Sequence, residues 1–173
     1  ATIVAKQCRA RVIITGTSHD KERLALAKEF GADYVVNVDE TDALEFVKDL
    51  THGEMAEMFV DVTGSYRMLE SAIDYVGVFG RIVTPGLYGP HPASIDYDKV
   101  VFKQARILGA HAQSYRADEA AVKLLESRKY PIEKMVTHKF TLDQAELAVL
   151  TTGREIEGEH PIKCVIMPNG FDV

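Results

Sequence analysis

The sequence predicts an α/β fold with a mostly parallel, doubly wound sheet. Short apolar runs rich in β-branched residues alternate with amphipathic stretches that have the length of helices along most of the chain. Glycine or proline separates many of these segments, as turns and helix ends require. Right-handed crossovers between such units place helices on both faces of one sheet.

The first elements follow this alternation. Residues 1–8 resemble the second half of a helix, so we expect further sequence upstream of Ala1. Residues 11–15 form a short apolar run, which indicates a strand buried on both faces. A helix is predicted from Asp20 to Gly31, and residues 33–38 predict the next strand. The apolar residues of this helix recur with helical spacing: Leu24, Ala27 and Phe30.

The middle of the chain repeats the pattern. Residues 40–53 predict a helix that ends in glycine, and residues 58–64 predict a strand. Residues 65–76 predict a further helix, and residues 80–86 a further strand after a glycine turn. The inward positions of the two helices are Leu44, Val47 and Leu50, and Leu69, Ile73 and Val76.

The last third begins in the same way and then changes. After a loop with two prolines, residues 105–111 predict a strand and residues 116–127 a helix. A capped helix follows over residues 141–153, with Thr141 and Gln144 spaced as in a capping box. One final strand is predicted over residues 161–168, and this tail need not belong to the same sheet.

Composition excludes several classes of function. The chain has 173 residues, a net charge of −6 and a pI of about 5.5, so nothing indicates a nucleic-acid or anionic-membrane partner. No apolar run approaches the roughly 20 residues needed to span a bilayer. Cys8 and Cys164 lie in no metal-binding motif and are expected to be reduced packing residues of a cytoplasmic protein.

The loop after the first strand is the first candidate site. In a dinucleotide-binding fold, a strand end of this type faces the adenosine ribose, and an acidic residue there binds both ribose hydroxyls and selects NAD. A small or hydroxyl residue with basic neighbours leaves room for a 2′-phosphate. The loop offers Gly16, Thr17 and Ser18, with Lys21 and Arg23 just beyond.

A simpler interpretation of the same loop remains open. Asp20 is its only acid, and as a helix N-cap this side chain would point at its own backbone. The loop would then be a capped helix start with ordinary surface charges.

The strand ends at residues 61–65 and 83–89 form a second candidate site. Ligands of open α/β sheets bind outside the carboxyl ends of the strands. Gly64 and Gly86 lie at matching positions there, where a missing side chain allows close approach to the backbone. The alternative is that each glycine simply ends a strand. The histidines, serines and carboxylates form no metal-binding or catalytic motif, so we assign no catalytic residue and no metal ligand.

Taken together, these segments resemble the medium-chain, zinc-type alcohol dehydrogenase family, and most closely its polyol (sorbitol) and threonine dehydrogenase-like branch. The most specific runs, in chain order, are "KEFGAD", "GRIVTPG" and "VTHKFTLDQAELA". The resemblance covers nearly the whole chain. It implies an oxidoreductase with a Rossmann-like cofactor domain that transfers a hydride between a secondary alcohol or polyol and NAD or NADP.

The resemblance also implies a domain organisation. Residues 1–134 correspond to the dinucleotide-binding domain, and residues 135–173 to a segment that returns to a GroES-like catalytic domain. The family's first Rossmann strand, its glycine-rich loop and its zinc ligands have no counterpart here. We therefore expect a fragment that is not active alone and that does not itself bind the zinc of the complete enzyme.

Site residues follow by position within the family pattern. Ser18 occupies the ribose-selecting place and Arg23 the nearby basic place, which favours NADP over NAD. Thr63 and Gly64 would lie by the adenine or the nicotinamide ribose, whereas the backbone of Gly86 and Leu87 would face the nicotinamide carboxamide. The edge strand Arg106–His111 would join subunits of a homo-oligomer, and residues Gly109 and His111 would line the nicotinamide side.

The absent strand is the central one of the family's sheet. We therefore expect that a separate fragment supplies it, that the two halves close up, or that a strand of another copy fills the gap. A second hypothesis for function is a non-catalytic Rossmann-type module that binds or senses a dinucleotide. A methyltransferase that uses S-adenosylmethionine is a third, which the tail does not suit.

Overall fold

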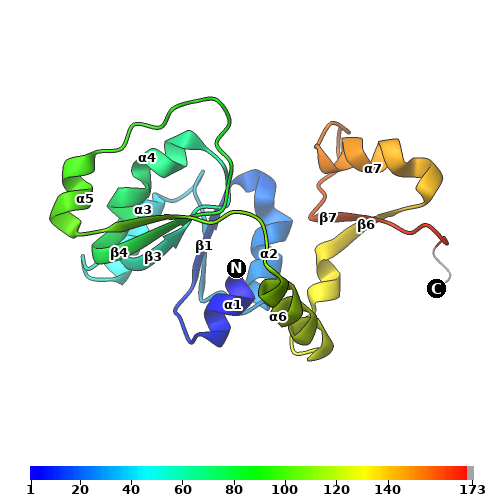
Figure 1. The fold of residues 1–173 in the computed structure, drawn as a ribbon, viewed down its shortest axis with the longest axis horizontal. Helices are drawn as coiled ribbons and strands as arrows, with labels where there is room; N and C mark the ends of the chain where they lie inside the picture. The colour runs from blue at the N-terminus through cyan, green and yellow to red at the C-terminus, as the bar shows by residue number, and fades with distance from the viewer. Residues whose placement is uncertain (171–173) are drawn as a thin grey trace. The chain divides into compact units, whose positions relative to one another are not determined.

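The computed structural model describes residues 1–170, which form two compact units. The discontinuous unit comprises Ala1–Glu40 and Glu119–Val173, and the continuous unit comprises Thr41–Asp118. No helix among the described residues is both long enough and apolar enough to cross a membrane. In chain order the elements are α1 (Thr2–Gln7), β1 (Ile13–Gly16), the 3₁₀ helix η1 (Ser18–Asp20), α2 (Lys21–Glu29), β2 (Tyr34–Asn37), α3 (Ala43–Leu50), β3 (Ala56–Val60), α4 (Tyr66–Tyr75), β4 (Val76–Thr84), α5 (Tyr97–Lys103), β5 (Arg106–Gly109), α6 (Tyr115–Glu126), η2 (Ile132–Met135), β6 (Val136–Phe140), η3 (Leu142–Gln144), α7 (Ala145–Thr152) and β7 (Lys163–Ile166) (Figure 1).

The discontinuous unit begins with a β-α-β element. Strands β1 and β2 are parallel, and their register runs from Ile13 opposite Tyr34 to Gly16 opposite Asn37. Helix α2 connects them and ends before Gly31, whose φ of +94° suits a glycine at a helix end. One buried cluster of this unit consists of Ile3, Leu26 and Phe30, with partly buried Leu124, Tyr130, Ile132, Met135 and Ile162 packed against it.

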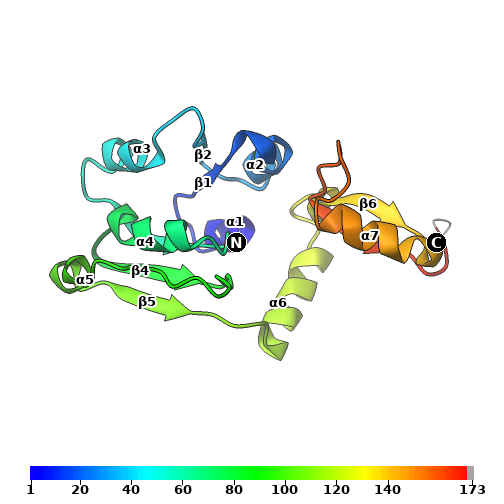
Figure 2. The same ribbon diagram turned by 90° about the horizontal axis from the view of Figure 1, so that it is seen from above.

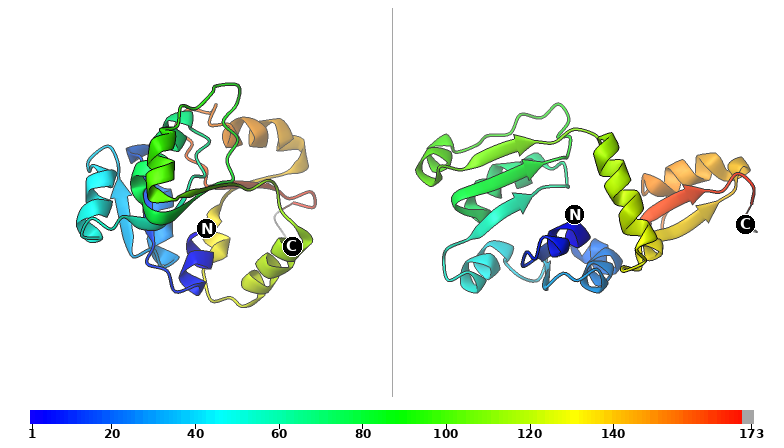
Figure 3. Two further views of the ribbon diagram at one scale, coloured as in Figure 1. Left: turned by 60° about the vertical axis from the view of Figure 1, so that its left-hand side comes forward. Right: turned by 60° about the horizontal axis from the view of Figure 1, so that its bottom comes forward.

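A second parallel pair in the same unit is formed by β6 and β7, with α7 as the connection between them. The right-hand view of Figure 3 shows the two strands side by side with α7 running along them. The predicted capping box is confirmed at η3, where both the amide and the hydroxyl of Thr141 donate to Gln144 Oε1 at 3.1 Å. The tail therefore forms a ladder of its own, as the sequence allowed.

The continuous unit is built on the parallel sheet β3-β4-β5. Figure 2 shows β4 and β5 running alongside each other, with α5 at the end where β5 begins. Burial of α4 and α5 against this sheet forms the core, whose members are Ala72, Ile73, Val76, Ile82 and Val100. The Lys103 ammonium donates to the last carbonyls of α4, Ile73 O and Val76 O, both at 2.8 Å, and so satisfies two acceptors at a helix end.

Two elements differ from the sequence-based prediction. Helix α5 was not predicted, because the adjacent valines Val100 and Val101 are typical of a strand. Its first turn is capped by Asp96, whose Oδ1 accepts from Lys99 N. Strand β6 was not predicted either, although its burial alternates with the period of two typical of a strand. Cys8 is exposed, so its predicted role in packing is wrong, whereas Cys164 is partly buried.

The predicted α/β fold with parallel strands is confirmed, but among residues 1–170 the strands form separate ladders. Strand β1 pairs with β2, and β3 pairs with β4. Closure of the two halves into one sheet stays a prediction, because β1 and β3 belong to different compact units. A strand supplied by a separate fragment or by another copy remains a prediction.

Candidate functional site

The Ser18 loop lies where β1 ends, at the carboxyl edge of the β1-β2 pair. Gly16 is the last residue of β1, and Thr17 precedes η1. The Ser18 amide donates to Asp39 Oδ2 at 2.7 Å, and Ser18 Oγ accepts from Asn37 Nδ2 at 3.0 Å. Hydrogen bonds from Ser18 hold the pKa of the Asp39 carboxyl below its usual value. The predicted ribose-selecting serine therefore has an acid from the next strand beside it.

Asp20 connects this loop to the C-terminal part of the same unit. It stands at the N-cap of α2 but makes no side-chain bond to that helix. Its carboxylate instead accepts from the amide and the hydroxyl of Thr17, at 3.3 and 3.0 Å, and completes a capping box at η1. Its other oxygen lies 3.3 Å from Arg154 Nη2. Partial burial raises the pKa of Asp20, but the hydrogen bonds from Thr17 and Arg154 outweigh this effect and the net pKa lies below its usual value.

The two predicted basic residues of the loop differ in their surroundings. Arg23 donates through Nη2 to the Pro161 carbonyl at 2.6 Å, and its Nη1 lies 3.6 Å from Asp20 Oδ1. Its guanidinium is thus already bound by protein groups. Lys21 is exposed and makes no hydrogen bond or ion pair with any described residue. Lys21 is therefore the cation of the loop that is available to an anionic ligand.

The predicted glycines of the continuous unit meet at the carboxyl edge of β3 and β4. Gly64 has a φ of +68°, and a Cβ placed on it would lie 2.6 Å from the carbonyl oxygen of Leu87. A Cβ on Gly86 would lie 2.9 Å from the amide nitrogen of Gly64. Both contacts are too short for a real side chain, so each glycine is required by the backbone of the other loop. This contact brings Gly64, Gly86 and Leu87 together.

A buried carboxylate holds the first of these two loops. Asp61 is 1% exposed, and its Oδ1 accepts from Thr63 N at 2.8 Å and from Thr63 Oγ1 at 2.6 Å. Its Oδ2 accepts from the Tyr88 hydroxyl at 2.8 Å. Burial, the hydrogen bond to Asp61 and the charge of Asp61 raise the pKa of Tyr88 to about 12, so the phenol remains a donor at neutral pH.

The remaining predicted residues lie at the next strand. Gly109 ends β5 and pairs in register with Thr84 of β4, which places it at the same edge of the sheet. His111 lies two residues farther on and is exposed. No contact between His111 and the glycine loops is observed in the described part of the chain.

Four residues that the sequence analysis did not select have direct contacts to this set: Asn37, Asp39, Asp61 and Tyr88. A signal existed for the first two, because parallel pairing of β1 and β2 places both strand ends at one edge. The signal for Asp61 was an acid directly after a strand. Nothing local distinguishes Tyr88, whose partner lies 27 residues away.

This architecture defines the class of protein. Parallel strands alternate with helices, and glycine-containing loops lie at the carboxyl ends of the strands, as in Rossmann-like α/β proteins. Among residues 1–170, no three His, Cys, Asp or Glu side chains cluster in a way that could hold a metal ion.

Comparison with known proteins identifies the family. The model of the family described as "Zinc-binding dehydrogenase" matches residues 1–127, and the chain belongs to this family. It is 30% identical over 168 residues to a sorbitol dehydrogenase of Halalkalibacterium halodurans, which covers 97% of this chain and 48% of that protein. It is 33% identical over 139 residues to an L-threonine 3-dehydrogenase of Pyrococcus abyssi, which covers 79% of this chain and 39% of that protein.

A solved structure agrees with this assignment. An alcohol dehydrogenase of Thermotoga maritima superposes with a TM-score of 0.84 at 26% identity, covering 97% of this chain and 46% of that one. The chain thus spans about half the length of the relatives it matches, 48% for the sorbitol dehydrogenase. The resemblance to zinc-type alcohol dehydrogenases, including sorbitol and threonine dehydrogenases, is confirmed.

Proposed function

We propose that this chain is the cofactor-binding part of an NAD(P)-dependent alcohol or polyol dehydrogenase. The observation that supports it most strongly is the meeting of Gly64 with Gly86 and Leu87 at the carboxyl edge of the sheet, where open α/β sheets bind their ligands. The family assignment supports a nicotinamide dinucleotide as the ligand of such an edge. The reaction of the complete enzyme is hydride transfer between a secondary alcohol and the nicotinamide.

The same proposal covers the organisation of the complete enzyme. Residues 1–134 belong to the cofactor domain, and residues 135–173 return to a catalytic domain that lies outside this sequence; residues 171–173 lie outside the described part of the chain. The separate β6-β7 ladder supports this boundary. Zinc, as a Lewis acid, would polarise the alcohol oxygen in the complete enzyme. No cluster among the described residues could hold this zinc, so the chain is proposed to be inactive alone. A cytoplasmic location is a separate part of the proposal.

The proposal includes a preference for NADP over NAD. Ser18 has a short neutral side chain, and the free ammonium of Lys21 can bind a 2′-phosphate. Two contacts oppose this preference: the Asp39 carboxylate beside Ser18 would repel a phosphate, and Arg23 is held by Pro161 and Asp20. The test therefore has to separate the contribution of Lys21 to the preference for NADP from the contribution of Ser18 and its neighbours in the loop.

Calorimetric titration of the natural protein with NADPH and NADH provides that test. We expect NADPH to bind more tightly than NADH. Lys21→Gln should weaken the binding of NADPH by about tenfold, or about 1.4 kcal/mol, and leave the affinity for NADH unchanged. Lys123→Gln is the matched control, since this exposed lysine pairs only with Glu119 on α6. Preference for NADH that Ser18→Asp does not alter would refute the NADP assignment. Absence of binding by either dinucleotide would refute the proposed function, whereas binding without any dehydrogenase activity would favour a non-catalytic module.

The proposal also includes self-association through β5. All four residues of this edge strand are exposed, including Ile107 at 38% and Leu108 at 44%, and an open apolar edge invites a second strand. Sedimentation of the natural protein should show an oligomer that Ile107→Lys dissociates. Val101→Lys, at an exposed apolar position of α5, should leave it intact. A monomeric natural protein would refute this part of the proposal.

A further inference from the structure

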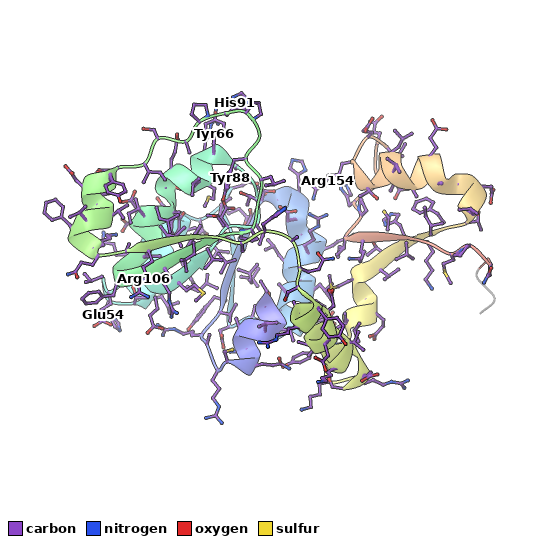
Figure 4. The ribbon with its side chains drawn as sticks, in the orientation of Figure 1. Glu54, Tyr66, Tyr88, His91, Arg106 and Arg154 are labelled. Atoms are coloured by element: carbon purple, nitrogen blue, oxygen red, sulfur yellow. The ribbon has the colours of Figure 1, made fainter. Side chains whose placement is uncertain are left out.

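The loop that follows β4 is anchored at three places within the continuous unit. Tyr88 donates to Asp61, the ring of His91 lies 5.7 Å from that of Tyr66, and the Ser94 amide donates to Glu70 Oε1 at 2.8 Å. Figure 4 shows Tyr66, the first residue of α4, close to His91 of the loop, with Tyr88 nearer the sheet. Of these anchors, Tyr88 is the nearest in sequence to Gly86 and Leu87. It is therefore the anchor that acts most directly on the position of their backbone.

The partner of Tyr88 is fixed by its own surroundings. The Asp61 amide donates to Val83 O at 2.9 Å, which continues the β3-β4 pairing, and its carboxylate accepts both donors of Thr63. Thr63 Oγ1 in turn accepts from the Ser65 amide at 3.0 Å, immediately before α4. A buried carboxylate with three donors is a rigid acceptor, because moving any one donor leaves a buried charge less well satisfied.

The two loops also make direct backbone contact. Because a Cβ on Gly64 would lie 2.6 Å from Leu87 O, and a Cβ on Gly86 2.9 Å from Gly64 N, each loop defines the position of the other. The hydrogen bond between Tyr88 and Asp61 spans the same pair of loops. The Gly64 and Gly86–Leu87 backbones therefore form one surface, with the Tyr88–Asp61 bond behind it.

We propose that Asp61 and Tyr88 are positioning residues, which hold the Gly64 and Gly86–Leu87 backbones in the geometry that receives the nicotinamide half of the dinucleotide. This inference rests on the proposed function. Neither side chain has to touch the ligand. Their effect is specific to one half of the cofactor, because the Ser18 loop, assigned to the adenosine half, does not include them.

The selectivity for one half of the cofactor separates positioning from a merely structural role. A bond that only stabilised the fold would, when removed, change the affinity for the whole dinucleotide and for its adenosine half alike, or change neither. A bond that positions the nicotinamide backbone changes the affinity for the whole dinucleotide alone. ADP-ribose, or its 2′-phosphate where NADP is the cofactor, lacks the nicotinamide and is the probe for the adenosine half.

The experiment uses the natural protein with Tyr88→Phe, which removes one hydroxyl and keeps the ring. We expect the dissociation constant of the reduced dinucleotide to rise about tenfold and that of the ADP-ribose probe to change less than twofold. Asp61→Asn should act in the same direction. Should it fail to fold, Tyr88→Phe alone remains decisive. Tyr97→Phe is the control, because Tyr97 lies on α5 with 69% of its surface exposed and should change neither constant.

The outcomes are distinct. Selective weakening of the complete dinucleotide by Tyr88→Phe supports the inference. Equal weakening of both ligands, or no change in either, overturns it while leaving the proposed function in place. Failure of the unmodified protein to bind the dinucleotide overturns the proposed function and this inference together.

Discussion

Gly64→Ala tests how closely the two glycine loops approach each other. At its φ of +68°, a residue other than glycine costs about 1–2 kcal/mol. The new Cβ would also lie 2.6 Å from Leu87 O, and relieving such overpacking costs a further 1–3 kcal/mol or so. We therefore expect the free energy of unfolding to fall by about 2–5 kcal/mol.

Gly89→Ala is a closely matched control. Gly89 has the same φ of +68°, but a Cβ placed on it would meet nothing within 4 Å. Only the backbone cost of about 1–2 kcal/mol applies to it, and the effect of alanine on the unfolded chain is common to both variants. Urea unfolding gives both free energies. Equal losses for Gly64→Ala and Gly89→Ala would refute the inferred contact with Leu87.

Three further predictions concern stability. Asp42→Ala should cost about 1 kcal/mol in urea unfolding, because its carboxylate accepts from two amides at the start of α3, whereas Ser65→Ala, at a cap with no side-chain bond, should cost much less. Ile73→Ala should cost about 2–5 kcal/mol, since the side chain is 1% exposed, and a loss as small as that of Val78→Ala, at 63% exposure, would contradict the core assignment. The pKa of Tyr88 is raised to about 12 from an unfolded value of about 10, so its contribution is complete below pH 10 and is lost as the pH rises towards 12. Partial exposure limits this loss to about 1–2 kcal/mol, and unfolding measured from pH 9 to 12 should show it in the unmodified protein and not in Tyr88→Phe.

Local patterns in the sequence were sufficient for most elements. The apolar spacing in α2 identified Leu24, Ala27 and Phe30 as one face, and all three are buried. The capping box at Thr141 was readable because both of its partners lie within four residues. Helix α5 was missed since one capping aspartate outweighs a pair of valines that resembles a strand.

The candidate site was less predictable because its contacts are not local. Ser18 was assigned from its own loop, yet the acid beside it comes from the end of a neighbouring strand. Gly64 and Gly86 were each weak signals, and only their mutual contact explains both. Tyr88 could not be selected at all, since an isolated tyrosine in a loop gives no indication of a buried carboxylate 27 residues away.

The division of the chain into units has a consequence for synthesis. One unit is continuous, Thr41–Asp118, while the other combines Ala1–Glu40 with residues from Glu119 onward. As the nascent chain leaves the ribosome, Thr41–Asp118 can fold once it has emerged, whereas the first 40 residues must wait for partners such as Pro161 and Arg154. Contacts of such high sequence separation form late. The edges of β1 and β2 are then left open in the growing chain, and a segment that precedes the continuous unit becomes protected only after that unit.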